Sequence, residues 1–189
     1  RDIPGLVLAC PSNGADAVEM LRECVRLAAE EQRIVVFVEP IALYMTRDLH
    51  EANDALWTAP YAAPGEAKPI RLGELGTHGQ GEDLAIVSYA NGHYLSRQAA
   101  KILEDEHGLK LRVIDLRWLS PVDEAALVEA TKGCSRVLIV DECRRTGSQS
   151  EALMTTFAER APDVLCRRIT AEDSFIPLGR AATLTLPSR

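Results

Sequence analysis

Short, continuous apolar runs alternate along this chain with longer segments that have helical periodicity. The clearest run is residues 34–38 (IVVFV), which is rich in β-branched and aromatic side chains. A strand of this composition has both of its faces covered, as in a parallel sheet. It is preceded by another apolar run at residues 6–10 and by a helical segment at residues 15–31. The first 38 residues therefore predict one strand–helix–strand unit.

The predicted helix at residues 15–31 has a start signal and an apolar face. Ser12 or Asn13, in the preceding turn, can cap its first amide groups. Helical spacing groups several apolar side chains on one face, which we expect to be buried. These side chains are Val18, Leu21, Cys24, Val25 and Ala28.

The same alternation continues through residues 82–189. Strands are expected at residues 84–89, 111–116, 136–141 and 164–169, and helices at residues 94–106, 121–131 and 147–159. Gly108 ends the first of these helices, and Ser120 with Pro121 marks the start of the second. Strands that alternate with helices predict an α/β fold with mostly parallel sheets.

Residues 46–81 separate the two alternating regions. Proline and glycine are frequent and periodicity is weak here, as is typical of a linker, although residues 70–74 have the pattern of a short edge strand. Trp57 and Tyr61 are expected to anchor this linker rather than to form a binding site. The third segment, residues 82–189, has the size of a normal domain, whereas residues 1–45 are too few to bury a core alone.

The small first segment predicts that the chain is part of a longer protein. There is no initiator methionine, and residues 1–5 lead directly into the first expected strand. Residues 1–45 therefore either complete a domain whose other strands lie elsewhere or join the sheet of the third segment.

Charge and composition exclude several classes of partner. The formal net charge is −7 and the isoelectric point is about 5.2, so the chain lacks the basic field that a nucleic-acid or anionic-membrane surface needs. No apolar run approaches the roughly 20 residues of a membrane-spanning helix. We therefore expect neither a nucleic acid nor a membrane as a partner.

The cysteines predict a reduced, cytoplasmic protein. They are Cys10, Cys24, Cys134, Cys143 and Cys166. Their number is odd and their spacing contains no CxxC motif, which disfavours a zinc site and favours small core residues. Cys143 differs, because Arg144 and Arg145 beside it could lower the pKa of its thiol. No histidine follows His107 along the chain, however, and this disfavours a catalytic cysteine.

Polar residues that follow the expected strands are the remaining candidates for chemistry. Asp141 and Glu142 could form an acid–base pair, but we favour a structural ion network with Arg144, Arg145 or Arg117. His93 near a helix start could bind an anion, but a capping or solvated position is favoured. Nothing in the sequence distinguishes the other three histidines: His50, His78 and His107. Glycine-rich nucleotide motifs and the GxSxG elbow are absent from the sequence.

Several of these segments, in their order, resemble one enzyme family. IPGL at 3–6 with PS at 11–12, and VFVEP at 36–40 with LY at 43–44, resemble the end of the pyrimidine-binding domain of thiamine-diphosphate enzymes. The closest resemblance is to the β component of 2-oxo acid dehydrogenase E1. IVSY at 86–89, VIDLRWLSPVD at 113–123 and VDECRRTG at 140–147 resemble the C-terminal domain of that family, the transketolase family. DSFIP at 173–177 and LPS at 186–188 resemble its tail.

This resemblance implies a division of the chain and a role for it. Residues 1–45 would be the C-terminal end of a pyrimidine-binding domain, residues 46–81 a linker, and residues 82–189 a Rossmann-like transketolase C-terminal domain. The intact enzyme would use thiamine diphosphate and Mg²⁺ to decarboxylate a 2-oxo acid and pass the acyl group to lipoamide. The family's activating glutamate, active-site histidine and Mg²⁺ ligands match no residue here. We therefore expect no catalytic, cofactor-binding or metal-ligating residue in this chain, which alone would be inactive.

The resemblance also implies partners. The chain would join the remaining pyrimidine and diphosphate domains in a homo- or hetero-oligomer and would offer a docking face to the acyltransferase E2. The length of the linker suggests an E1 with α-like and β-like parts fused in one chain. Residues 26–33 depart from the family pattern where some members hold a monovalent cation, so that site is not carried over.

Two alternatives stay open. The parent could be another transketolase-like enzyme, such as a ketol transferase or a synthase, with Arg117 and Arg145 as its candidate phosphate-binding residues. Alternatively, the chain could be a stand-alone flavodoxin-like interaction module. The residues do not select a particular 2-oxo acid.

Overall fold

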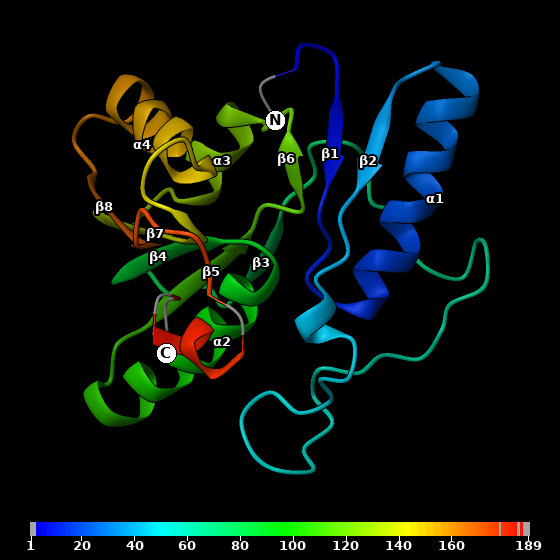
Figure 1. The fold of residues 1–189 in the computed structure, drawn as a ribbon. Helices are drawn as coiled ribbons and strands as arrows, with labels where there is room; N and C mark the ends of the chain where they lie inside the picture. The colour runs from blue at the N-terminus through cyan, green and yellow to red at the C-terminus, as the bar shows by residue number, and fades with distance from the viewer. Residues whose placement is uncertain (1–2, 178, 185, 187–189) are drawn as a thin grey trace.

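The computed structural model describes residues 3–177, 179–184 and 186, and it contains two β-sheets (Figure 1). The first sheet has the order β2-β1-β6, with β1 at Val7–Ala9, β2 at Val35–Phe37 and β6 at Trp118–Ser120. The second has the order β3-β5-β4-β7-β8, with β3 at Gly76–His78, β4 at Leu84–Ser88, β5 at Leu111–Asp115, β7 at Arg136–Arg144 and β8 at Leu165–Ala171. Four α-helices connect the strands: α1 (Gly14–Glu30), α2 (Ala90–His107), α3 (Glu124–Ala130) and α4 (Gln149–Arg160). Two short 3-10 helices are η1 (Ile41–Leu43) and η2 (Gly179–Leu184).

The predicted α/β class with mostly parallel pairing is confirmed. In the second sheet β5, β4, β7 and β8 all run parallel, and only the edge strand β3 is antiparallel to its neighbour. In the first sheet β1 and β2 are parallel, as the strand–helix–strand unit predicts. Gly108 ends α2 in the left-handed conformation that is expected of a glycine there.

The first sheet takes its third strand from the far side of the sequence. β6 follows β5 of the second sheet, yet it pairs antiparallel with β1, more than 100 residues away (Figure 1). The strand pattern did not predict this pairing. The structure also corrects the expected start of the helix at residues 121–131. Ser120 lies in β6, where its hydroxyl donates to the carbonyl oxygen of Leu6, and Asp123 instead caps α3 by accepting from the amide of Ala126.

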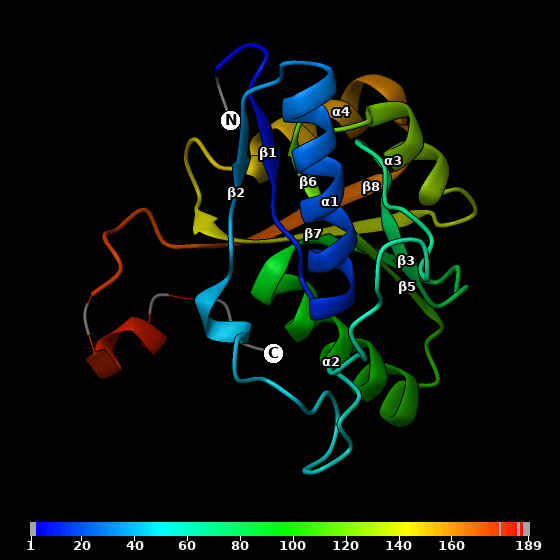
Figure 2. The same ribbon diagram turned by 90° about the vertical axis from the view of Figure 1, so that its right-hand side faces the viewer.

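The face by which α1 packs differs from the expected one. Figure 2 shows α1 in front of β1, covering one face of the first sheet. The side chains buried on this helix are Asp16, Glu19, Met20, Glu23, Cys24 and Leu27. Leu21 and Val25, which we expected to be buried, are 50% and 61% exposed. Acidic side chains can occupy the buried face because arginines pair with them: Glu23 binds both Arg26 and Arg71.

The apolar run at 34–38 is likewise covered on one face only, where two-sided coverage was expected. Val35 and Phe37 pack against the core beneath α1. Ile34, Val36 and Val38 point the other way and are 73%, 42% and 39% exposed. β2 is an edge strand in the part of the chain that the structure describes, where it pairs with β1 alone.

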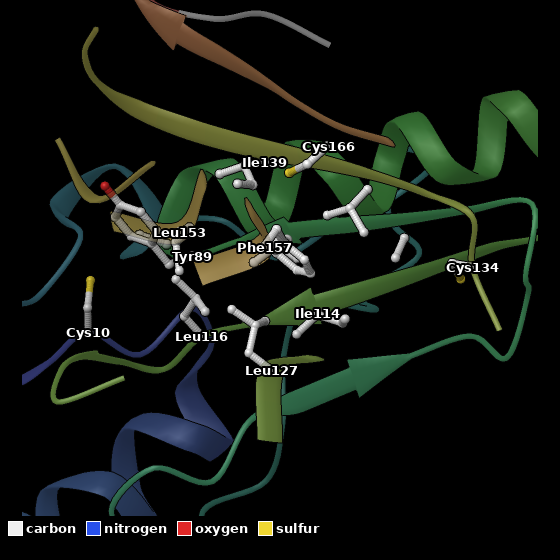
Figure 3. Close-up of a cluster of buried hydrophobic side chains, with 14 residues drawn as sticks. Cys10, Tyr89, Ile114, Leu116, Leu127, Cys134, Ile139, Leu153, Phe157 and Cys166 are labelled. Carbon is white, nitrogen blue, oxygen red and sulfur yellow. The ribbon is translucent and has the colours of Figure 1, made fainter. Parts of the chain in front are cut away.

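The main core lies between the second sheet and the helices α3 and α4 (Figure 3). Its largest fully buried members include Ile114 and Leu116 from the β5 segment, Leu127 from α3, and Leu153 and Phe157 from α4. Cys10, directly after β1, also belongs to this core. The two sheets therefore share packing at the end of β1.

The segment between the sheets is irregular but anchored. Asp54 accepts from the backbone amides of Leu49, His50, Glu51 and Leu56. Trp57 is buried and packs edge-on against Tyr94 at 5.0 Å between ring centroids, as expected of an anchoring residue. Tyr61 is exposed, and its hydroxyl accepts from Arg22.

The edge strand expected at residues 70–74 lies at Gly76–His78 instead. Of the tail motif at 186–188, residues 187 and 188 lie outside the described residues.

Candidate functional site

The carboxyl ends of strands from both sheets meet in one place, where ligands bind in open α/β folds. The amide of Cys10, after β1, donates to the carbonyl oxygen of Arg117, after β5, at 2.8 Å. The hydroxyl of Ser12 accepts from the amide of Ala90, after β4, at 2.8 Å. We call the polar residues gathered here the junction cluster. Its members are Ser12, Asp16, Ser88, His93, Asp115 and Arg117.

Arg117 connects the two sheets within this cluster. Its Nε and Nη2 donate to the two carboxylate oxygens of Asp16 at 2.8 and 3.0 Å, and its Nη1 donates to the carbonyl oxygen of Leu75 at 3.1 Å. Both side chains of the pair are nearly buried, with 13% and 12% exposed. A two-point bond of this kind fixes the angle between its partners as well as their distance. The guanidinium of Arg117 is therefore occupied by groups of its own chain.

His93 and Asp115 form the buried centre of the cluster. Nε2 of His93 lies 4.0 Å from Oδ2 of Asp115, and Nδ1 of His93 lies 3.5 Å from the hydroxyl of Ser88. Neither Nε2 nor Oδ2 has a hydrogen-bond partner among the described residues. Burial lowers the pKa of His93 well below its usual value, and burial raises the pKa of Asp115 to about 7. Each group therefore favours its neutral form.

The solvated or capping position expected for His93 is wrong. α2 begins at Ala90, four residues earlier than expected, so His93 lies in its first turn and faces β5 from the interior. A neutral, fully buried imidazole does not attract an anion from solvent. His78, on β3, lies 5.1 Å from His93 between ring centroids, and burial lowers its pKa to about 4. The sequence did not distinguish His78, because only the β3–β5 pairing brings it here.

A second polar group lies at the end of β7. Asp141 is fully buried and accepts from the hydroxyl of Tyr89 at 2.7 Å and from the amides of Cys143 and Ser150 at 3.0 and 2.7 Å. These hydrogen bonds lower the pKa of Asp141 although burial opposes them. The expected ion network between Asp141 and arginines is therefore wrong: the carboxylate stabilises the first turn of α4 and the end of β7 instead.

Glu142, beside it, has the opposite shift. Burial raises the pKa of Glu142 to about 7, and the charge of Asp141 adds to this effect. The register of β7 against β8 shifts between Asp141 and Arg144, which turns successive side chains to different surroundings. The pKa values of these two adjacent carboxyls are therefore shifted in opposite directions, as in an acid–base pair, but Asp141 is already satisfied by donors of its own chain.

Cys143 does not have the activated thiol that its arginine neighbours suggested. Burial raises the pKa of the Cys143 thiol, and the charges of Asp141 and Glu142 raise it further. Arg144 is turned away, because its Nε donates to the carbonyl oxygen of Thr146 at 2.9 Å. Cys143 nevertheless has an exposed side chain, while the other four cysteines are buried.

The two candidate phosphate-binding arginines are not brought together. Arg117 follows β5 and Arg145 follows β7, and β4 lies between these strands. His50 lies in the segment between the sheets, where its amide donates to Asp54, and His107 lies in the last turn of α2. Among the described residues, no three histidine, cysteine or acidic side chains gather as a metal-binding group.

A cavity of about 350 Å³ opens beside the start of α1, which sequence reasoning did not identify. Its walls include Asn13, Phe37, Glu39, Tyr44 and Trp57. Asn13 caps α1 by accepting from the amide of Asp16, and Glu39 accepts from the hydroxyl of Tyr44 at 2.6 Å. The signal for this cavity was present in the sequence, since β1 ends at Ala9, shortly before Asn13, and β2 ends at Phe37.

Comparison with known proteins identifies the family. The family described as "Transketolase, C-terminal domain" matches residues 73–186. This chain belongs to that family. The pyruvate dehydrogenase E1 component subunit beta of Staphylococcus aureus is 28% identical over 189 residues, which cover 98% of this chain and 53% of that protein. The same subunit of Staphylococcus epidermidis has the same identity and coverage.

A solved structure agrees on the fold. A split gene transketolase, described as an inactive β4 tetramer, superposes with a TM-score of 0.67 at 21% identity, covering 93% of this chain and 51% of that one. These matches confirm the resemblance to E1 β and transketolase proteins. The chain spans about half the length of the curated relatives it matches. The family match begins at residue 73, inside the expected linker, and the boundaries at 45 and 81 stay predictions.

The pairing of Arg117 with Asp16 predicts a large effect on stability. Arg117→Ala leaves a nearly buried carboxylate without its partner, and we expect the free energy of unfolding to fall by about 3–5 kcal/mol. Urea denaturation followed by circular dichroism measures this change. Arg160→Ala removes the exposed pair with Glu124 and should cost less than about 1 kcal/mol. Equal losses in the two variants would contradict a special role for Arg117.

The raised pKa of Asp115 predicts a pH dependence. The folded protein holds a proton on this carboxyl up to about pH 7, whereas the unfolded chain releases it near the ordinary value of 3.8. The stability that Asp115 contributes is therefore complete below about pH 4 and is lost as the pH rises to about 7. In Asp115→Asn this loss disappears. The difference in unfolding free energy should shift in favour of the variant by at most about 1.4 kcal/mol per pH unit.

Urea titrations at several pH values between 4.5 and 7.5 measure that difference. His78 and His93 titrate in both proteins, so their contributions largely cancel. Ile139→Val, which only removes a buried methyl group, should cost about 1 kcal/mol at every pH. A difference between wild type and Asp115→Asn that stays constant across this range would contradict the raised pKa.

The exposure and raised pKa of Cys143 predict slow, selective alkylation. Native protein at pH 7.5 should take up one iodoacetamide group, at Cys143, more slowly than free cysteine does, because the thiolate is the reactive form. Mass spectrometry should detect five groups after unfolding in urea. Cys143→Ser should abolish the native reaction. Reaction faster than that of free cysteine would restore the arginine-activated thiol.

Proposed function

We propose that this chain is the C-terminal part of a thiamine-diphosphate-dependent E1 component, which decarboxylates a 2-oxo acid and transfers the acyl group to lipoamide. Within that enzyme the chain has a structural role: it completes the pyrimidine-binding domain and provides contacts for oligomerisation and for the acyltransferase E2. The observation that carries this proposal is the similarity to E1 β subunits over 98% of the chain. Their printed name describes a component of pyruvate dehydrogenase, and we extend only the class of reaction.

The polar groups at the strand ends support a structural role. Asp16 and Arg117 neutralise each other, Asp141 accepts hydrogen bonds from Tyr89, Cys143 and Ser150, and Glu39 accepts from Tyr44. Mg²⁺ and a diphosphate would need free carboxylate and amide oxygens and free donors. The occupied state of these groups supports a structural role for them rather than the binding of Mg²⁺ and a diphosphate. The enzyme's cofactor site is therefore proposed to lie in the portion of the protein that this chain does not span.

An E1 fits these residues better than a transketolase that acts on sugar phosphates. Such an enzyme would need basic side chains free to bind phosphate, and Arg117 is held by Asp16 and Leu75. The split gene transketolase supports the fold alone, since its identity to this chain is 21%. The 2-oxo acid itself is left unassigned.

Partners and compartment follow from the same proposal. The chain would assemble with the remaining pyrimidine and diphosphate domains in a homo- or hetero-oligomer. We place it in the cytoplasm, because all five cysteines are free thiols, as is usual in a reducing compartment. Among the described residues, no helix has both the length and the apolar character that crossing a bilayer requires.

Decarboxylation assays test this proposal. The 189-residue chain, supplied with thiamine diphosphate, Mg²⁺ and pyruvate or a branched-chain 2-oxo acid, should release no CO₂ above background and should give no heat of cofactor binding in calorimetry. The complete native protein that contains these residues, purified together with its partner subunits, should decarboxylate at least one of these acids. Turnover by the chain alone would refute the structural role, and an inactive complete assembly would refute the E1 assignment.

A further inference from the structure

We propose that Asn13 is a site of spontaneous modification, at which the amide nitrogen of Gly14 attacks the Asn13 side chain and converts it to aspartate or isoaspartate. The chain has three asparagines, and two of them, Asn13 and Asn91, precede glycine. A following glycine hinders this attack least, because it has no Cβ beside the attacking nitrogen. The structure places the two asparagine–glycine pairs in opposite surroundings. This inference does not depend on the proposed function.

The reaction is an intramolecular substitution followed by hydrolysis. The Gly14 amide loses its proton to solvent, and its nitrogen forms a bond to Cγ of Asn13. The bond from Cγ to Nδ2 breaks, and Nδ2 takes up a proton and leaves as ammonia. Water then opens the five-membered imide ring at either of its two carbonyl groups. One opening gives aspartate, and the other gives isoaspartate, whose main chain runs through the former side chain. No group is oxidised or reduced.

The attacking nitrogen is unpaired and accessible. Gly14 is exposed and is the first residue of α1, so its amide has no acceptor within the helix. Among the described residues, no backbone oxygen outside the helix accepts from it either. A Cβ built at Gly14 would meet no atom within 4 Å, which shows that the space around it is open. The positive end of the α1 dipole also stabilises the amide anion that forms the new bond.

Asn13 is prepared as the acceptor of this bond. Its Oδ1 accepts from the amide of Asp16 at 3.0 Å. This hydrogen bond stabilises the negative charge that develops on Oδ1 when nitrogen bonds to Cγ. The backbone of Asn13 is extended, with φ of −145° and ψ of 166°, so ring closure disturbs only the end of a helix. Asn13 and Gly14 both line the cavity of about 350 Å³ beside α1, which gives water access to the ring.

Asn91 has the same following residue but a protected position. It is the second residue of α2, and Gly92 after it is buried. A Cβ built at Gly92 would lie 3.2 Å from the carbonyl oxygen of Val140, so β7 packs closely against this turn. Oδ1 of Asn91 is buried and has no hydrogen-bond partner among the described residues, so no donor polarises its carbonyl. Ring closure at Asn91 would require α2 to separate from β7.

The modification affects the contact between the two sheets. Isoaspartate adds one methylene group to the main chain directly before α1 and moves the capping carbonyl of residue 13 into the main chain. The amide that loses this cap belongs to Asp16, whose carboxylate binds Arg117. Aspartate, the other product, keeps the cap, because it is as good an N-cap as asparagine. We therefore expect isoaspartate alone to loosen the start of α1.

Ageing of the complete native protein at pH 8 and 37 °C, followed by tryptic peptide mapping, tests the site. The three asparagines fall in separate tryptic peptides, which are residues 2–22, 48–71 and 72–97. We expect Asn13 to be converted at least tenfold faster than Asn91. In protein unfolded by guanidinium the two rates should agree within about threefold, because both asparagines precede glycine. Equal rates in the native protein, or an unmodified Asn13, would overturn the proposal.

Gly14→Ala tests the attacking group, with Ala15→Gly as the matched control in the same exposed turn. The added Cβ should slow the conversion of Asn13 at least tenfold, and it fits the fold because the space at residue 14 is open. Ala15→Gly should leave the rate within about twofold, since residue 15 does not supply the nitrogen. A Gly14→Ala variant that reacts as fast as Ala15→Gly would refute the attack by the Gly14 amide.

Hydrogen exchange tests the consequence for the sheet contact. Anion exchange separates aged from fresh protein, because each conversion adds a negative charge, and electron-transfer fragmentation identifies the isoaspartate fraction. In that fraction the peptide with the first turn of α1 should exchange at least threefold faster than in fresh protein. Asn13→Asp, which keeps the cap, should exchange like fresh protein. Unchanged exchange in the isoaspartate fraction would refute the effect on the contact between the sheets.

Discussion

The bidentate bond between Arg117 and Asp16 is the constraint on which the relation of the two sheets depends. Arg117 is the residue at which the chain leaves β5 of one sheet and enters β6 of the other, and its backbone is in the left-handed region, with φ of 59°. A non-glycine residue in that region costs of order 1 kcal/mol or more. The three hydrogen bonds of its guanidinium to Asp16 and Leu75 offset this cost and hold α1 against the second sheet.

Around this bond the molecule stabilises buried polar groups in two different ways. Hydrogen-bond donors surround Asp141 and lower its pKa, whereas burial disfavours the charged forms of Asp115 and His93, whose Oδ2 and Nε2 atoms have no hydrogen-bond partner among the described residues. The first arrangement anchors a helix start at any pH near neutrality. From the second we expect a contribution to stability that depends on pH. In both arrangements the polar side chains stabilise the fold, and neither arrangement exposes a charged carboxylate or imidazole to solvent.

Local patterns were sufficient to predict the parallel strands of the second sheet, since the runs at 84–89 and 111–116 differ from β4 and β5 by one residue each, but they misplaced the antiparallel edge strand β3. They were insufficient for α1, which has two competing stripes. The stripe with Leu21 and Val25 is more apolar, but the stripe with Glu23 is buried because arginines neutralise its carboxylate. The β1–β6 pairing and the approach of His78 to His93 were unpredictable from local sequence, because each joins segments that are far apart in the chain or pair only in three dimensions.

The failed expectation of a strand covered on both faces at 34–38 separates what composition predicts from what the described residues provide. The composition of a strand predicts which of its faces should be buried, and the structure shows which faces the described residues bury. For β4 and β7 the two agree, since helices and neighbouring strands cover both faces. For β2 they disagree, and the disagreement is confined to one face and one edge. Val35 and Phe37 pack into the core of the first sheet, whereas Ile34, Val36 and Val38 are exposed on the other face of the same run.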